Sequence, residues 1–228
     1  MPANKNAKIR YPIRLMAVDM AGEQIINRLR NDGVHIREDN APTPVDIVLV
    51  SSKEGVQNLS DIPSSYASTT KTVLIQMDSN LHIPEIPGID SVLSFSPTVD
   101  FHNALKRFLL LMRNNIEAQK RPLICSDFYD FFTLIAGRRT LSVYSYKYED
   151  DISMAISDPR SISSIKGARY LLTLALTQKA LDSLTMAELL SIENMVKRKF
   201  RDADFINYNL TLSTSNEITQ LISAPTSN

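Results

Sequence analysis

The adjacent pair Cys125-Ser126 is the feature of this chain that most directly suggests nucleophilic chemistry. Either nucleophile would need a base such as histidine within hydrogen-bond reach. The three histidines, His35, His82 and His102, stand far apart, and no spacing ties one of them to Cys125. Free cysteines usually pack as small hydrophobic residues. We therefore expect Cys125 to be structural and none of the histidines to be catalytic.

Metal and disulfide chemistry is not expected either. The chain has one cysteine and three scattered histidines, and this pattern gives no zinc-ligand spacing. A lone cysteine cannot form an internal disulfide, which favours a reducing, cytoplasmic location. We predict no metal and no cofactor.

Phosphate-binding loops need closely spaced glycines, and this chain lacks them. Its six glycines are never closer together than eleven residues: Gly22, Gly33, Gly55, Gly88, Gly137 and Gly167. Neither G-x-G-x-x-G nor G-x-x-x-x-G-K-[ST] can be written from that spacing, and both loops use clustered glycines to bring backbone N–H groups onto phosphate. The sequence therefore predicts no standard glycine-rich loop for binding the phosphates of a nucleotide.

Composition describes an ordinary globular protein. The 228 residues include 25 Lys+Arg and 25 Asp+Glu, so the formal net charge is zero and no basic excess favours nucleic acid. With 43% hydrophobic and 22% charged residues, the chain is neither disordered nor membrane-like. The polar start has no apolar stretch behind it, and no apolar run is long enough to cross a bilayer, so we expect neither secretion nor insertion.

The first half of the chain is expected to form a compact α/β unit, whose strands and helix would position any site there. Runs rich in β-branched residues predict strands over 13–18, 46–50, 72–77 and 91–95, and a helix is expected over 22–30. This spacing suggests a parallel sheet with helical crossovers. Several connections should be short or irregular, because prolines mark the loops between these strands.

A long helix is expected over 99–119, where apolar residues recur every three or four positions. Leu110 and Leu111 widen the apolar stripe, which indicates burial on more than one side. About 21 residues would make a rod of roughly 30 Å, long enough to bridge two small subdomains. A second α/β stretch follows, with helices over 128–136, 152–157 and 185–200 and strands over 140–146, 170–175, 205–212 and 217–224.

Three short motifs resemble the FtsZ/tubulin superfamily. Residues 155–159 (AISDP), followed by Gly167-Ala168-Arg169, resemble the A-I-S-x-P … G-A-R-x-x-L stretch of that family's second domain. Residues 123–130 (LICSDFYD) are similar to the N-V-D-F-A-D loop after its central helix, and residues 24–29 (QIINRL) to the N-A-V-N-R-M after its first glycine loop. The resemblance implies a trimmed Rossmann-like parallel-sheet domain over 1–98, a central helix over 99–122 and a second α/β domain over 123–228.

The departures from the family concern its nucleotide site. Where the family has a run of glycines after its first strand, this chain has side-chain bulk and two carboxylates, Asp19 and Glu23. Where the family has G-G-G-T-G-T-G, residues 51–56 read SSKEGV, with one glycine and no nest of N–H groups. Lys106 and Arg107 stand near the position at which the family reads guanine with an acidic side chain. We therefore expect no nucleotide to bind.

The resemblance also implies an interface. The family's two acids after the central helix reach into the next subunit's pocket and orient the water that attacks GTP there, and Asp127 and Asp130 occupy those positions here. The resemblance therefore implies no catalytic residue in cis, but two acids that this chain could offer in trans to a nucleotide held by an intact homologue. A simpler alternative is that Ser126 or Asp127 caps the following helix. The nearby aromatic residues fit core packing or an exposed contact patch, and Phe128 and Phe132 are the interface candidates among them.

The resulting interpretation is a non-catalytic FtsZ-like protein, a pseudo-GTPase that acts through association. Its expected partner is a second copy of itself, in a scaffold that needs no nucleotide, or an intact FtsZ-type homologue whose filament it binds or caps in the cytoskeleton. The alternative is a residual GTP-binding and GTP-hydrolysing cytoskeletal protein. The residues after 224 carry neither the flexible linker nor the apolar-basic tail that FtsZ-type proteins use to reach membrane adaptors, so no direct membrane contact is expected.

Overall fold

The structure is a computed structural model that describes residues 13–34, 36–37, 43–59, 71–97, 99–117, 128–147 and 165–226. The chain divides into two compact units, Met1–Asp90 and Ser91–Asn228. The expected division into 1–98, 99–122 and 123–228 stays a prediction.

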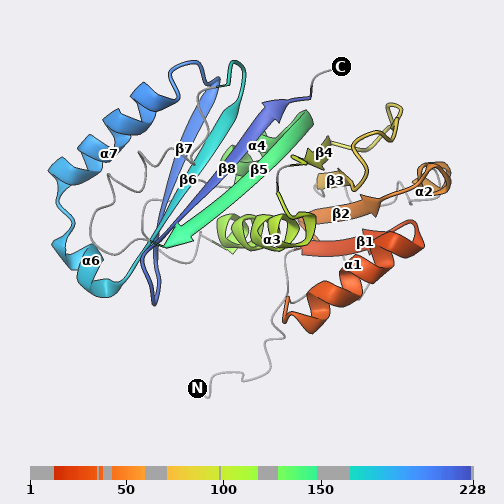
Figure 1. The fold of residues 1–228 in the computed structure, drawn as a ribbon, viewed down its shortest axis with the longest axis horizontal. Helices are drawn as coiled ribbons and strands as arrows, with labels where there is room; N and C mark the ends of the chain where they lie inside the picture. Colours follow the sequence, from red (N-terminus) through yellow and green to blue (C-terminus); the bar gives the residue numbers. More distant parts are fainter. Residues whose placement is uncertain are drawn as a thin grey trace, which may run out of the picture. The chain divides into compact units, whose positions relative to one another are not determined.

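The first unit is a parallel α/β arrangement. Strands β1 (Ile13–Ala17), β2 (Val45–Val50) and β3 (Lys71–Gln76) pair in parallel in that order, and helices α1 (Met20–Asn31) and α2 (Lys53–Asn58) follow β1 and β2 (Figure 1). All six residues of β2 are buried. A near-continuous apolar strand of this kind is typical of a parallel sheet covered on both faces.

A buried ion pair links β1 to β2. Arg14 and Asp46 lie opposite each other in the register, and two guanidinium nitrogens of Arg14 donate to the carboxylate at 2.9 and 2.6 Å. The hydroxyl of Thr43 donates to the same carboxylate at 2.6 Å. Because both charged side chains are almost fully buried, each compensates the charge of the other inside the unit.

The described residues of the second unit include five strands in the order β4-β5-β8-β6-β7. These are β4 (Ser91–Phe95), β5 (Gly137–Lys147), β8 (Glu217–Pro225), β6 (Arg169–Leu176) and β7 (Phe205–Leu212). β8 runs antiparallel to β5 and β6, whereas the β4–β5 and β6–β7 pairs are parallel. Its described helices are α3 (Phe101–Glu117), α4 (Phe128–Ile135), α6 (Gln178–Ser183) and α7 (Met186–Lys199).

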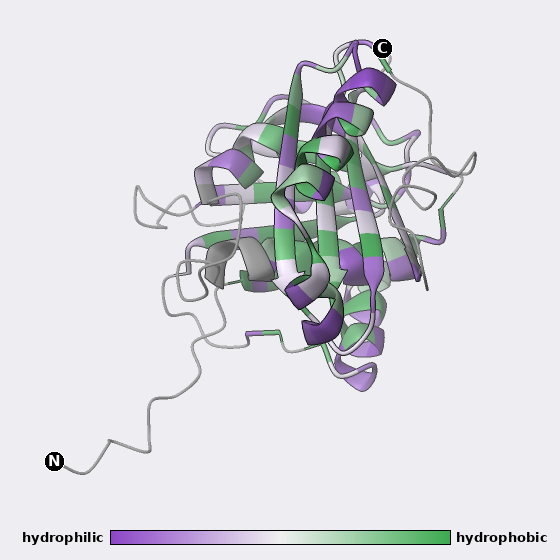
Figure 2. Ribbon diagram, turned by 90° about the vertical axis from the view of Figure 1, so that its left-hand side faces the viewer, coloured by the Kyte–Doolittle hydropathy of each residue, from purple (hydrophilic) through white to green (hydrophobic). Residues whose placement is uncertain are grey.

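Two apolar groups hold the second unit together. One is a chain of rings in which Phe108 of α3 contacts Phe95 of β4 and Phe131 of α4, with centroid separations of 6.1 and 5.9 Å. The other packs α7 against β6 and β7, and Tyr170 stacks on Phe200 at 4.0 Å. Hydrophobic and hydrophilic residues alternate along the helices, as Figure 2 shows. In α7, for example, Ile192 and Val196 are buried, whereas Met186 and Leu190 are exposed.

The expected strands are confirmed to within three residues at each end, and the mixed α/β class is confirmed. Two six-residue helices, α2 and α6, were not anticipated, because so short a helix shows no periodicity. Each begins at a hydroxyl cap, Ser52 or Thr177. The helix expected over 152–157 lies outside the described residues.

Within α3 the apolar stripe is as wide as expected, with one exception. Leu111 is buried, whereas Leu110 is among the exposed large hydrophobic residues. His102, although polar, is also buried on this helix, with its side chain only 5% exposed.

Candidate functional site

The carboxylate of Asp19 lies between the beginnings of two helices. Asp19 directly precedes α1 and is its N-cap, with Oδ1 accepting from the Gly22 N–H at 3.0 Å. Its Oδ2 accepts from the Ser51 N–H at 2.7 Å and from the Ser52 hydroxyl at 3.3 Å, just before α2. One half-buried carboxylate thus accepts hydrogen bonds from donors that follow two different strands, β1 and β2.

Two glycines make room for this arrangement. A Cβ atom added to Gly55 would lie 2.4 Å from Oδ2 of Asp19, and one added to Gly22 would lie 2.7 Å from the Cβ of Ala17. Real Cβ atoms do not approach other atoms so closely. These glycines therefore allow the carboxylate and the strand end to pack tightly against the helices.

The same hydrogen bonds keep Asp19 ionised. Burial alone would raise the pKa of its carboxyl group, but hydrogen bonds from Gly22, Ser51 and Ser52 to the charged form lower that pKa below its ordinary value. The Asp19 carboxylate is therefore negatively charged at neutral pH.

A strand followed by a helix N-terminus is where α/β proteins commonly place a phosphate group, which then accepts hydrogen bonds from backbone N–H groups. Here the Gly22 and Ser51 N–H groups already donate to Asp19. A triphosphate at this place would have to displace that carboxylate and would meet its negative charge. The residues of this site fit an internal carboxylate and do not fit a triphosphate.

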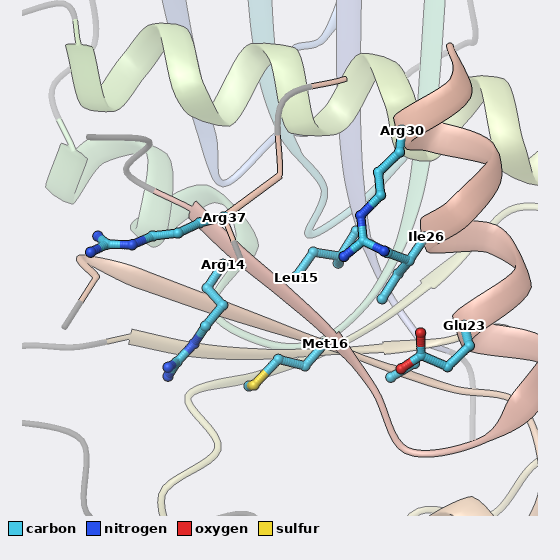
Figure 3. A pocket seen from close by; sticks show the side chains of 8 residues that line it. Arg14, Leu15, Met16, Glu23, Ile26, Arg30 and Arg37 are labelled. Carbon is cyan, nitrogen blue, oxygen red and sulfur yellow. The ribbon is translucent and has the colours of Figure 1, made fainter. Parts of the chain in front are cut away.

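The second carboxylate expected at this place does not contribute. Glu23 is exposed in the first turn of α1 and lines a separate pocket with Arg14 and Arg30 (Figure 3). Of the two carboxylates that replace the family's glycines, only Asp19 accepts the Gly22 and Ser51 N–H groups. Lys106 and Arg107 are half-buried on α3, in the second unit.

The second candidate region is the first turn of α4. Phe128 begins this helix, Asp130 is half-buried, and the side chain of Tyr129 is 75% exposed. Phe132 is 7% exposed, and its ring lies 6.5 Å from that of Phe131. Phe132 therefore lies in the core, and Tyr129 is the exposed aromatic residue that sequence reasoning did not single out. Asp127, Cys125 and Ser126 lie outside the described residues.

The Gly-Ala-Arg motif holds α4 in place. A guanidinium nitrogen of Arg169 donates to the backbone oxygens of Thr133 and Ala136 at the end of this helix, at 2.5 and 3.2 Å. Ala168 is fully buried, and Gly167 has a positive φ of 74° that favours glycine. The motif therefore orients the helix that carries Tyr129 and Asp130.

The remaining polar candidates form no site in the described part of the chain. His82 is exposed, and His35 lies outside the described residues. Over those same ranges no group of three His, Cys, Asp or Glu side chains is arranged to hold a metal ion. None of the described helices combines the length and apolar character needed to cross a membrane.

Comparison with known proteins identifies the fold. No family model matches the sequence, and no curated protein matches it. CetZ from Methanosaeta thermophila strain DSM 6194 has a similar structure, with a TM-score of 0.51 and 13% identity over 91% of this chain and 67% of that one. TubZ of Clostridium botulinum phage c-st gives a TM-score of 0.52 and 8% identity over 94% of this chain and 92% of that one.

TubZ from Bacillus thuringiensis serovar israelensis, in GDP-form protofilaments, gives a TM-score of 0.51 and 9% identity over 89% of this chain and 70% of that one. CetZ and TubZ are proteins of the FtsZ/tubulin superfamily. The chain therefore has a divergent FtsZ/tubulin-like fold.

Proposed function

We propose that this chain is a non-catalytic, FtsZ-like protein that acts in the cytoplasm through association with other subunits and without a nucleotide. The single observation that carries this proposal is the position of the Asp19 carboxylate, which accepts the Gly22 and Ser51 N–H groups. In the family that the sequence resembles, the glycine-rich loops at these positions hold phosphate.

The first turn of α4 is the proposed contact surface. Tyr129 presents an exposed ring beside Asp130, and aromatic side chains are enriched at the centres of interfaces. Similar structures include TubZ from Bacillus thuringiensis serovar israelensis in a GTPγS-form and in GDP-form protofilaments. A subunit that keeps the acid-bearing end but holds no nucleotide would add to one end of such a filament and stop its growth.

Calorimetry tests the loss of nucleotide binding. GTP and GDP should give no saturable heat with the full chain, whereas an intact FtsZ-type protein in the same buffer serves as the positive control. A dissociation constant in the micromolar range or tighter, about −8 kcal/mol, would support the residual GTPase alternative instead.

Mixing experiments then separate the two modes of association. With an intact FtsZ-type protein, substoichiometric amounts of the chain should shorten the polymers in sedimentation and light-scattering assays and lower GTP turnover in proportion. A stable homo-oligomer in light scattering after size exclusion, without any effect on those polymers, would favour the self-assembling scaffold. If neither effect occurs, association through α4 is not the function of this chain.

A further inference from the structure

Strand β7 is the last strand in the strand order of the second unit, and one of its edges is open. In the described part of the chain, β7 pairs with β6 alone. An edge strand carries a row of backbone N–H and C=O groups with which a further strand can pair. Figure 1 shows β7 as the outermost strand on the side of α7. The open edge and this helix therefore form one margin of the unit.

Two hydrogen bonds show which backbone groups of β7 face outward. The Ser213 N–H, just after the strand, donates to the backbone oxygen at the end of β6 at 2.7 Å. The Tyr208 N–H donates instead to Oδ1 of Asn207, the side chain of its own neighbour, at 2.8 Å. Because successive residues of a strand direct their N–H and C=O groups to alternate sides, the groups of Tyr208, Leu210 and Leu212 face the open edge.

The sequence of β7 contains nothing that blocks this edge. Natural edge strands are commonly protected by a lysine, a proline or a bulge. Residues 205–212 (FINYNLTL) contain no charged residue, no proline and no glycine. Two such edges can therefore pair with each other without bringing like charges together.

Exposed apolar side chains lie beside the open edge. Met186 and Leu190 of α7 are 70% and 52% exposed, and Leu212 of β7 is 52% exposed. Leu210 belongs to the apolar cluster beneath α7, and Leu212 lies on the same face of the strand, because side chains alternate along it. Three of the six large hydrophobic residues that are exposed in the described part of the chain therefore lie on these two elements.

The helical period places the exposed residues of α7 on the side of β7. Glu193, Met186 and Leu190 lie about 100°, 120° and 160° around the helix from the buried Ile192, all in the same direction. Burial and, after it, the charge of Glu193 raise the pKa of Tyr208 to about 12, which places Glu193 beside β7. Met186 and Leu190 therefore lie on the flank of α7 that is turned toward β7 and its open edge.

This margin is complementary to a second copy of itself. A two-fold axis perpendicular to the sheet brings β7 alongside β7 of the second copy and antiparallel to it. With the axis at Leu210, each Leu210 exchanges two backbone hydrogen bonds with its counterpart, and the exposed Leu212 lies opposite Tyr208. This register agrees with the observed directions of the hydrogen bonds of β7.

The same axis brings the two α7 helices together. Because β6 and β7 are parallel, α7, which connects them, runs antiparallel to both. Tyr208 and Leu210 are about 6.6 Å apart along the strand, or about four residues of helix, so Leu210 is level with the region of Leu190. Each Leu190 therefore approaches its counterpart. Glu193 is paired with Lys197 at 2.5 Å within each chain, so these two residues add no net charge to the flank.

We propose that two copies of this chain form a two-fold symmetric dimer through the open edge of β7 and the flank of α7 that carries Met186 and Leu190. The two sheets become one continuous sheet, and the exposed apolar side chains become buried between the copies. Main-chain hydrogen bonds supply affinity, and the side chains supply specificity. The dimer needs neither a nucleotide nor the α4 surface. A two-fold contact closes on itself, whereas the α4 contact would add subunits to a filament.

The mass of the full chain in solution tests the dimer. Light scattering after size exclusion should give the Tyr129→Ala variant a mass of twice 25.6 kDa, because α4 is not part of this contact. The wild type should show the same mass or, where α4 also associates, a larger one. A monomer mass for Tyr129→Ala would overturn the proposal, whereas a dimer would leave it standing even if the α4 contact fails.

A charge at the edge tests the strand pairing. Leu212→Lys introduces the residue with which natural edge strands are protected, and it should weaken the dimer at least about tenfold in sedimentation velocity. Ser191→Lys is the matched control, because Ser191 is exposed on α7 but lies about 100° around the helix from Leu190, further from β7. It should leave the dimer within about twofold. An equal loss in both variants would show that added charge alone causes the effect.

Two opposite charges test whether the α7 flanks meet. Leu190→Lys and Leu190→Glu should each weaken the dimer at least about tenfold, because like charges then meet across the axis. An equimolar mixture of the two variants should recover a dimer with one copy of each, because opposite charges meet there. Circular dichroism confirms that each variant is folded. A mixture that stays monomeric would contradict the proposed axis.

Discussion

The beginnings of α1 and α4 each carry an aspartate, and the fold uses the two in opposite ways. Asp19 turns inward at α1, where it accepts hydrogen bonds from Gly22, Ser51 and Ser52. Asp130 lies half-buried in the first turn of α4, next to the exposed ring of Tyr129. The aspartate at α1 accepts hydrogen bonds within its own unit, whereas the first turn of α4 carries an exposed aromatic side chain.

This difference is the basis of the proposed function. A site filled by the protein's own charge needs no ligand for its stability, because its donors are already satisfied. The hydrogen bonds from Arg169 to the end of α4 fix the orientation of the helix that carries the exposed Tyr129. Such a division fits a protein that associates without a nucleotide.

The largest expected effect comes from the other internal carboxylate of the first unit. Asp46→Ala leaves Arg14 buried without its partner, and we expect the free energy of unfolding to fall by about 3–5 kcal/mol in urea denaturation. The double variant Arg14→Met with Asp46→Leu should recover most of that loss, because no charge remains buried. A loss below about 1 kcal/mol in Asp46→Ala would show that the ion pair is hydrated.

The next effect tests the carboxylate between α1 and α2. Asp19→Ala removes a helix cap and the acceptor of the Ser51 N–H, so we expect a loss of about 1–2 kcal/mol in the same measurement. Asp19→Asn keeps a capping oxygen and should lose less. Glu23→Ala is the control, since this side chain is exposed, and should change stability by no more than about 0.5 kcal/mol. Equal losses in Asp19→Ala and Glu23→Ala would contradict the assigned role.

Acid should remove the contribution of Asp19. Because hydrogen bonds lower its pKa in the folded state, its stabilisation is fully present above the unfolded-state pKa of about 3.9 and is lost as the pH falls through the folded-state pKa. The stability difference between the wild type and Asp19→Asn should therefore shrink as the pH falls from about 3.9 through the lower folded-state pKa. A constant difference over that range would show that the charge of Asp19 contributes nothing.

The smallest effect on stability is expected at α4. Tyr129→Ala should change the free energy of unfolding by no more than about 0.5 kcal/mol, because the side chain is 75% exposed. The same variant should weaken the effect on FtsZ-type polymers, or the homo-oligomer, whichever the wild type shows. Unchanged association would move the contact surface away from α4.

The sequence predicted most strands and the long helices because their patterns are local. Residues 205–212 alternate in a way that marks a strand by themselves, and α7 keeps the helical period over fourteen residues. The partners of Asp19 could not be predicted in the same way. Ser51 lies 32 residues further along the chain, and only the parallel pairing of β1 with β2 brings its N–H to the carboxylate.

The candidate interface shows the same limit. The motif around Asp130 pointed to α4, but periodicity does not tell which of its aromatic residues is exposed, and Phe132 proved to be buried while Tyr129 is not. That choice depends on which face of α4 meets α3 and on the bonds from Arg169 to the end of the helix.

By itself, the sequence determined that this protein lacks clustered glycines, has an α/β fold and carries motifs that resemble those of one superfamily. These features can be read from the sequence because glycine spacing and hydrophobic period are properties of neighbouring residues. The tertiary structure alone decided that the Asp19 carboxylate accepts hydrogen bonds at the starts of both α1 and α2, because this depends on the pairing of β1 with β2, two strands that are distant in the sequence.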